Sequence, residues 1–243
     1  MCAEYPVTPP GTCIRPIAFA EGGRGELSGN MVVNDISDVQ RIPMAGLQQD
    51  DPGGSGQTGI VVLCTANVCR SPMAVALLTR RLAALGVAVP VHSAGMLRQG
   101  DPPHPEVVSV MAGYGIAIAS HRSRIARAAD LARAGLVLAM ARENLRYAVL
   151  TEPGAWLHAF TLKELVRRGE QIGPRPPGEP FSGWLSRVHA GRDRIALLGD
   201  SAEDDVADPA GGPLRAYEGT ARLLDRLVTN LAELGWAHAG TPP

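Results

Sequence analysis

This chain has almost no net charge and no long apolar run. The 243 residues carry 23 Lys and Arg against 24 Asp and Glu, which gives a formal net charge of −1. No basic field is therefore available to attract nucleic acid or an anionic membrane. No apolar run approaches the ~18 residues of a spanning helix, and the start of the chain lacks the basic and apolar parts of a signal peptide. We predict a cytoplasmic protein with no nucleic-acid or membrane partner.

Cysteine is also rare, and its placement argues against a disulfide framework. Cys2 and Cys13 lie near the start of the chain, and Cys64 and Cys69 lie close together. Small secreted folds instead use several regularly spaced cysteine pairs. No group of His, Cys and carboxylate residues has the spacing of metal ligands. We therefore expect neither a metal nor another cofactor.

Periodic patterning begins only near residue 58. Residues 1–57 are rich in Gly, Pro, Gln and Asp and show no sustained apolar period. This composition is typical of a disordered leader. We expect one folded domain over residues 58–238 and a short tail over residues 239–243.

Within the expected domain, strand-like and helix-like patterns alternate. The short apolar runs are predicted to be strands: Ile60–Leu63, Val89–His92, Leu136–Met140 and Trp156–Phe160. Each run is followed by apolar residues at helical spacing, and the last helical stripe extends from Leu214 to Leu234. This order predicts an α/β fold, a four-stranded parallel sheet with helices on both faces. Because Pro90 cannot donate to a ladder, the second strand is expected at an edge.

The most informative segment follows the first predicted strand. It reads Cys64-Thr65-Ala66-Asn67-Val68-Cys69-Arg70-Ser71-Pro72 and leads into a helical pattern. A strand, a tight loop and a helix start form an anion site, because loop N–H groups and the positive end of the helix point to one place. Arg70 can hold two oxygens of a phosphate-like group. The residues predicted to bind phosphate are Thr65, Ala66, Asn67, Val68, Cys69, Arg70 and Ser71.

Cys64 is the candidate nucleophile of this loop. The field that binds phosphate also favours the thiolate, which is the reactive form. Ser71 is predicted to be the N-cap and Pro72 the first helical residue, and the Ser71 hydroxyl can donate to the thiolate. Asn67 is expected in the left-handed conformation that a tight loop needs. The alternative interpretation makes Cys64 a small core residue and Arg70 a solvated helix residue.

The segment from Val62 to Pro72 resembles the signature V-C-x-G-N-x-C-R-S-P of the low-molecular-weight protein tyrosine phosphatases, with Ala66 in place of a glycine. Asp208-Pro209 resembles the second half of that signature, and the likeness covers about residues 58–236. The resemblance implies a phosphomonoester hydrolase. Cys64 would form a cysteinyl-phosphate, Arg70 would hold the phosphate oxygens, and Asp208 would protonate the leaving oxygen.

Asp208 is the preferred acid among neighbouring aspartates. Only this aspartate is followed by proline and by a flexible Ala-Gly-Gly segment, and only it matches the family motif. The candidates in this acidic run are Asp200, Asp204, Asp205 and Asp208. His121 is interpreted either as a partner of the phosphate loop or as a structural histidine. Arg122 and Arg124 are expected on a solvated face near the site.

Aromatic residues are only 4% of the chain, and they are missing where the resemblance places the walls around a phenyl ring. Leu97, Arg98 and Ala210 occupy the possible substrate rim instead. We expect phosphotyrosine to bind more weakly than in family members with aromatic walls. We expect Arg98 to favour substrates with acidic residues beside the phosphorylated one.

Residues 169–199 are predicted to be a long loop or flap. An apolar stripe from Phe181 to Val188 permits two interpretations. The stripe either docks a surface helix, or it belongs to a flap that brings Trp184 to the rim as the missing wall.

Three functions remain open. The leading one is a protein tyrosine phosphatase acting on a phosphorylated protein or an aryl phosphate. The second is an arsenate reductase-like protein of the same fold, which needs a further cysteine pair although no cysteine follows Cys69. The third is a non-catalytic phosphate-binding regulator, which the joint presence of Cys64, Arg70 and Asp208 disfavours. Cys69 is also a possible redox partner that closes a disulfide with Cys64.

Overall fold

The computed structural model describes residues 59–237. The predicted leader over residues 1–57 and the tail over residues 239–243 lie outside the described residues. None of the described helices is long and apolar enough to cross a membrane.

Strands and helices alternate along the described residues, as the sequence pattern predicts. In chain order the elements are β1 (Ile60–Leu63), α1 (Arg70–Ala84), β2 (Val91–Ala94), α2 (Pro105–Gly113), α3 (Ala128–Ala132), β3 (Leu136–Ala139), α4 (Arg142–Thr151), the 3-10 helix η2 (Pro153–Leu157), β4 (Ala159–Thr161), α5 (Leu162–Ile172), α6 (Phe181–His189), the 3-10 helix η3 (Arg194–Leu197) and α7 (Leu214–Trp236).

The four strands form one parallel sheet in the order β2-β1-β3-β4. Leu63, the last residue of β1, is level with Ala94 of β2 and Ala139 of β3. The carboxyl ends of these three strands therefore meet at one edge of the sheet, which is where ligands bind in open α/β folds. The predicted fold class is confirmed, and β2 is an edge strand as Pro90 suggested.

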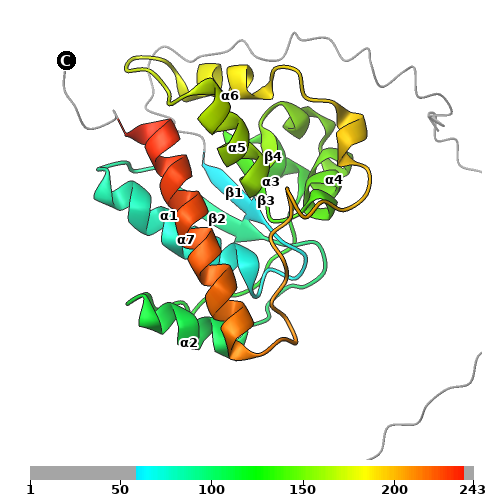
Figure 1. Cartoon of the computed structure of the whole chain (residues 1–243). Helices are drawn as coiled ribbons and strands as arrows, with labels where there is room; N and C mark the ends of the chain where they lie inside the picture. The colour runs from blue at the N-terminus through cyan, green and yellow to red at the C-terminus, as the bar shows by residue number, and fades with distance from the viewer. Residues whose placement is uncertain (1–58, 238–243) are drawn as a thin grey trace, which may run out of the picture. The chain divides into compact units, whose positions relative to one another are not determined.

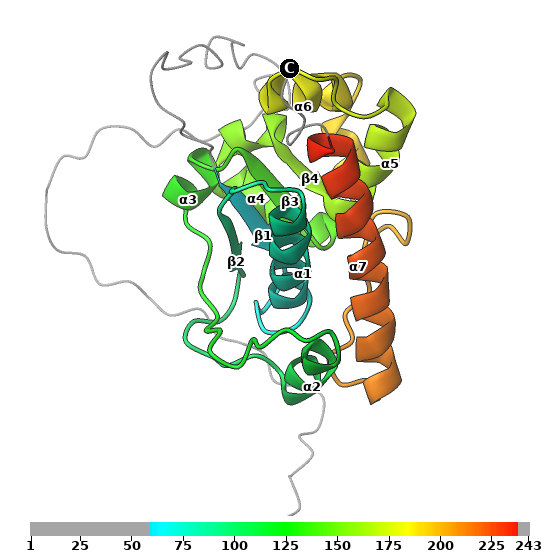
Figure 2. The same cartoon turned by 90° about the vertical axis from the view of Figure 1, so that its left-hand side faces the viewer.

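Helices cover both faces of the sheet and bury two separate apolar clusters. Ile60 and Val62 face the cluster built with α1, α2, α5, α6 and α7. Val61 and Leu63 face the smaller cluster built with α3, α4 and η2. Because successive residues of a strand point to opposite faces, burial on both sides explains the unbroken apolar run of β1. Figures 1 and 2 show α1 and α7 side by side on the face of the sheet that carries the larger cluster.

Two predicted strands begin too early. The second strand starts at Val91 instead of Val89, since Pro90 precedes the ladder and only its carbonyl pairs, accepting from the Ile60 N–H at 2.8 Å. The fourth starts at Ala159 because Trp156 belongs to η2, where its side chain packs into the smaller cluster. The backbone from Pro153 to Leu157 makes the hydrogen bonds of a short 3-10 helix. An apolar run in the sequence does not distinguish such a helix from the start of a strand.

Candidate active site

The loop between β1 and α1 lies at the carboxyl edge of the sheet and is held tightly by its neighbours. Asn67 has a φ of 55°, so the predicted left-handed residue is confirmed. Gly95, just after β2, lies against the loop: a Cβ at this position would be 2.9 Å from the Thr65 carbonyl oxygen and 2.9 Å from the Asn67 Cβ. Only glycine permits this close approach, which brings the end of β2 against the loop.

Cys64 is 2% exposed and receives hydrogen bonds from inside the loop. The Asn67 N–H donates to the Cys64 Sγ at 3.2 Å, and the Ser71 Oγ lies 3.0 Å from the same sulfur. The Asn67 Nδ2 donates to the Ser71 Oγ at 2.8 Å. With its oxygen accepting from Asn67, the Ser71 hydroxyl is oriented to donate to Cys64 and to stabilise its thiolate.

The predicted N-cap at Ser71 is wrong. Helix α1 begins at Arg70, Cys69 precedes it, and no side chain caps the helix. Ser71 is unavailable as a cap because its hydroxyl is engaged with Cys64 and Asn67. The first N–H groups of α1 are thus left without a side-chain acceptor, which suits an anion site.

His121 and Arg124 hold the loop from outside. The His121 Nε2 lies 2.7 Å from the Asn67 carbonyl oxygen. The Arg124 N–H donates to the Asn67 Oδ1 at 3.0 Å, and the Arg124 Nε donates to the Ser93 carbonyl at 2.8 Å. The loop-partner interpretation of His121 is therefore confirmed. Arg124 is half-buried against the loop, whereas Arg122 is exposed as predicted.

Arg70 is nearly buried and ties the loop to the segment that carries Asp208. Its NH1 donates to the Val206 carbonyl at 3.1 Å, and its NH2 donates to the Thr65 Oγ1 at 3.2 Å and to the Asp208 Oδ2 at 2.5 Å. Its Nε is buried and has no partner among the described residues. A guanidinium has five N–H donors, so Arg70 keeps donors for an anion held by the loop.

Asp208 is the only aspartate of the acidic run that contacts Arg70 within the described residues. Its side chain is 43% exposed, and its Oδ1 accepts from the Ala210 N–H at 3.2 Å. Asp204 is buried between Arg142 and Arg167; burial raises its pKa, but hydrogen bonds from these two arginines outweigh that effect and lower it. Asp205 accepts from the Arg142 N–H at 2.7 Å. Asp204 and Asp205 therefore hold α4 and α5 through arginine contacts, whereas Asp208 contacts Arg70 next to the phosphate loop.

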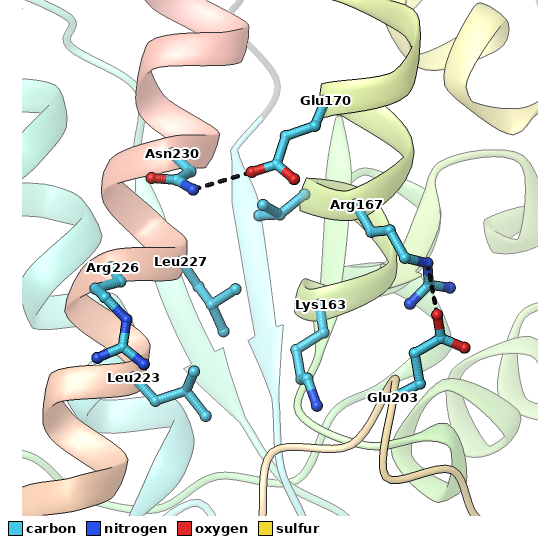
Figure 3. A pocket seen from close by; sticks show the side chains of 9 residues that line it. Lys163, Arg167, Glu170, Glu203, Leu223, Arg226, Leu227 and Asn230 are labelled. Carbon is cyan, nitrogen blue, oxygen red and sulfur yellow. Dashed lines mark hydrogen bonds and ion pairs between the residues drawn. The ribbon is translucent and has the colours of Figure 1, made fainter.

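Helix α5 anchors the segment that leads to Asp208. Between α5 and α7 lies a groove of about 360 Å³ with Leu223 and Leu227 on one side. Figure 3 shows Lys163 and Arg167 projecting from α5 on the other side, with Glu203 paired to Arg167. The Lys163 Nζ donates to the Ala202 and Asp205 carbonyls. These bonds fix the backbone just before Val206, whose carbonyl binds Arg70.

Cys69 lies beside Cys64 in the same loop but in a different environment. It is 3% exposed, and both thiols are free. Burial raises the pKa of Cys69 to about 12, and the nearby Asp208 and Cys64 add to the rise. Cys69 is therefore a protonated thiol at neutral pH.

The residues predicted to form the substrate rim differ in their exposure. Leu97 is 65% exposed beside the loop, Arg98 pairs with Asp101 at 3.1 Å, and Ala210 is exposed next to Asp208. The proposed wall residue Trp184 is fully buried, and its Nε1 donates to the Gly173 carbonyl at 3.0 Å.

Trp184 packs at the far end of α7 from the loop. Gly169 admits its ring, since a Cβ there would lie 3.1 Å from Trp184 and 3.0 Å from Leu234. Residues 169–199 thus contain a docked helix, α6, and the prediction that Trp184 lines the rim is wrong.

Sequence reasoning missed Glu143 and Asn144. The Thr65 hydroxyl donates to the Glu143 Oε1 at 2.5 Å, and the Asn144 Nδ2 donates to the Thr65 Oγ1 at 3.2 Å. The Asn144 side chain is buried, and its Oδ1 has no partner among the described residues. Both residues open α4 just after β3, the strand beside β1. Polar residues directly after a buried strand were the available signal.

A model of the low molecular weight phosphotyrosine protein phosphatase family matches residues 59–171. The chain is 40% identical over 144 residues to a probable low molecular weight protein-tyrosine-phosphatase, EpsP, of Ralstonia solanacearum, covering 58% of this chain and 97% of that protein. The chain belongs to the low-molecular-weight phosphatase family.

Other members of this family differ in the substrate that their names give. A protein-arginine-phosphatase of Geobacillus stearothermophilus is 30% identical over 175 residues, covering 72% of this chain and 93% of that protein. The crystal structure of the low molecular weight protein tyrosine phosphatase from T. tengcongensis superposes with a TM-score of 0.55 at 33% identity, covering 72% of this chain and 98% of that one. The comparisons thus identify a phosphatase of this family and leave tyrosine and arginine as alternative targets.

Proposed function

We propose that this phosphatase hydrolyses phosphotyrosine in proteins through a cysteinyl-phosphate on Cys64. The observation that carries the hydrolytic mechanism is the convergence of three groups at one loop: the Cys64 sulfur, the Arg70 guanidinium and the Asp208 carboxyl. The tyrosine target follows the name of the EpsP relative, which is 40% identical. The loop amides and Arg70 hold the equatorial phosphate oxygens and neutralise their charge in the transition state.

The reaction proceeds in two steps. In the first, the Cys64 sulfur bonds to phosphorus while the bond to the leaving oxygen breaks, and protonated Asp208 gives its proton to that oxygen. In the second, water attacks phosphorus, the Asp208 carboxylate takes a proton from it, and the sulfur–phosphorus bond breaks. Cys64 leaves as a thiolate, which the Ser71 hydroxyl and the Asn67 N–H stabilise.

The two steps can be tested by separate substitutions. Cys64→Ser should abolish release of p-nitrophenol from p-nitrophenyl phosphate while the thermal midpoint stays close to that of the wild type. Asp208→Asn should lower kcat/KM for phenyl phosphate by roughly 10²-fold or more but affect p-nitrophenyl phosphate much less, because a good leaving group needs little protonation. Substantial activity in the Cys64 variant would contradict the mechanism, and no activity in the wild type would favour a phosphate-binding regulator.

Phosphoarginine is the second candidate substrate, and Glu143 favours it. Two carboxylates lie close to Arg70, the residue proposed to hold phosphate. Its NH2 donates to the Asp208 Oδ2 directly, and it also donates to the Thr65 Oγ1, whose hydroxyl donates in turn to the Glu143 Oε1. Carboxylates at the mouth favour a cationic guanidinium over a neutral phenol. The exposed rim residues Leu97 and Ala210 offer no aromatic wall for a phenol.

Matched peptides carrying phosphotyrosine or phosphoarginine at one position separate the two candidates. If the substrate is phosphoarginine, Glu143→Gln should lower kcat/KM for that peptide roughly tenfold, the effect of ~1.4 kcal/mol, without lowering it for phosphotyrosine. Glu170→Gln is the control, since Glu170 bonds Asn230 across the α5–α7 groove (Figure 3), whose lining contains no residue of the phosphate loop. A higher kcat/KM for the phosphotyrosine peptide in the wild type would exclude the second candidate.

A further inference from the structure

One buried tyrosine joins the two loops on which the proposed mechanism depends. Tyr217, near the start of α7, is fully buried. Burial raises the pKa of its hydroxyl and the nearby Cys69 adds to the rise, while a hydrogen bond from the Gly211 N–H opposes it. Gly211 belongs to the turn that follows Asp208, and its φ of 77° is left-handed. The Tyr217 hydroxyl thus lies beside the turn that presents the acid, and the first turn of α7 packs against that turn, since a Cβ on Gly212 would lie 3.2 Å from the Ala216 Cβ.

His104 completes the link on the side of the phosphate loop. Its backbone N–H donates to the Val68 carbonyl at 3.0 Å, which ties the residue before α2 to the loop. Its ring stacks on Tyr217 with the centroids 5.1 Å apart, and its Nε2 lies 3.4 Å from the Tyr217 hydroxyl. Its Nδ1 lies 2.6 Å from the Glu106 Oε2.

The Tyr217 hydroxyl and the His104 Nε2 are a consistent donor and acceptor. When the His104 Nδ1 carries the ring hydrogen, the Nε2 presents a lone pair to Tyr217. The Tyr217 hydroxyl can then donate to that nitrogen while its oxygen accepts from the Gly211 N–H. The hydroxyl is used in both directions, so its removal breaks the connection between the two loops without disturbing the stacked rings.

Distance control matters because the acid must meet a leaving oxygen bound in the other loop. A general acid works within about 2.6–3.2 Å of that oxygen, and an error of ~1 Å can cost up to 10²-fold in rate. Asp208 is 43% exposed, and its own contacts are Arg70 and the Ala210 N–H. Arg70 must also hold phosphate, so another contact has to fix the turn while phosphate is bound.

We propose that Tyr217 and His104 are positioning residues that set the distance between Asp208 and the phosphate loop. This inference rests on the proposed function, because it assigns the pair a role only in delivering the proton. Neither side chain touches the substrate, so the nucleophile and the phosphate site should be unaffected by their loss.

Tyr217→Phe tests the proposal with phenyl phosphate and p-nitrophenyl phosphate as substrates. We expect kcat/KM for phenyl phosphate to fall roughly tenfold and that for p-nitrophenyl phosphate to change less than about twofold, because only the poor leaving group needs the acid. The rate of Cys64 alkylation by iodoacetate should stay unchanged. Tyr147→Phe is the control, since it deletes a hydroxyl bonded to the Ala126 carbonyl at 3.1 Å on the other face of the sheet.

His104→Phe provides a second variant that keeps a stacked ring and removes the acceptor nitrogen. It should show the same selective loss, and the double variant should be no worse than either single one, because both delete one connection. If Tyr217→Phe folds poorly, His104→Phe carries the test. Equal losses for both esters, or no loss for either, would overturn the positioning role alone. Failure of the wild type to hydrolyse either ester would overturn the proposed function and this inference with it.

Discussion

At the scale of single residues, Arg70 is the centre of the site. It contacts the phosphate loop through Thr65, the segment before Asp208 through the Val206 carbonyl, and Asp208 itself, the proposed acid. A nearly buried guanidinium is costly unless paired, and the carboxylate of Asp208 provides that pairing. The same contact places Asp208, the proposed acid, next to the group that would hold phosphate. One ion pair therefore stabilises Arg70 and positions Asp208.

Cys69 is a second residue whose own chemistry matters, because its raised pKa controls how readily it reacts after oxidation of Cys64. Peroxide should convert the Cys64 thiolate to a sulfenic acid, and Cys69 should then condense with it, releasing water and closing a disulfide. Because burial raises the pKa of Cys69 to about 12, its thiolate fraction and hence the rate of closure should increase with pH.

Recovery of activity by dithiothreitol after peroxide measures this protection. We expect high recovery in the wild type, rising from about pH 7 to about pH 9, and much lower recovery in Cys69→Ala. Equal recovery in the two proteins at every pH would show that Cys69 is only a packing residue.

At the scale of elements, α7 extends from the candidate active site to the region where it packs against α5 and α6. Its first turns carry Tyr217 beside the Asp208 turn, and its last turn carries Leu234 and Trp236 beside α6. Tyr217 and Leu234 are 17 positions apart in α7, which corresponds to roughly 25 Å of helix. Helix α6 therefore packs too far from the loop to serve as a lid, and its apolar side stabilises α5 and the end of α7.

Trp184→Ala distinguishes packing from substrate contact. Removing a fully buried indole should destabilise the domain by about 3–5 kcal/mol. The KM for aryl phosphates should not change at a temperature where the variant is folded. Urea denaturation and steady-state kinetics measure the two effects, and Leu150→Ala, at a side chain that is 83% exposed, is the control. A raised KM with normal stability would restore the idea that Trp184 contacts substrate.

At the scale of the whole molecule, residues 59–237 contain two apolar clusters, one on each face of the sheet. Both clusters reach the carboxyl edge, where they support the loop after β1 and the start of α4. Among the described residues, both clusters supply core residues next to Cys64 and Arg70.

Deleting residues 1–56 should therefore leave kcat/KM and the thermal midpoint nearly unchanged. The leader has no apolar period with which to form a core of its own. Parallel kinetics and thermal denaturation of the full chain and the shortened protein test this expectation. A large loss in either measurement would show that the leader contributes to the domain.

The sequence alone determined the sheet, its edge strand and the loop with Cys64 and Arg70, because these depend on local patterns: apolar runs, one proline and a contiguous motif. It also favoured Asp208, through Pro209 and the residues that follow. The tertiary structure decided which polar groups meet across long separations, such as Glu143 with Thr65 and Tyr217 with His104. It also decided that Trp184 is buried, since an apolar stripe specifies that a face is covered but not what covers it.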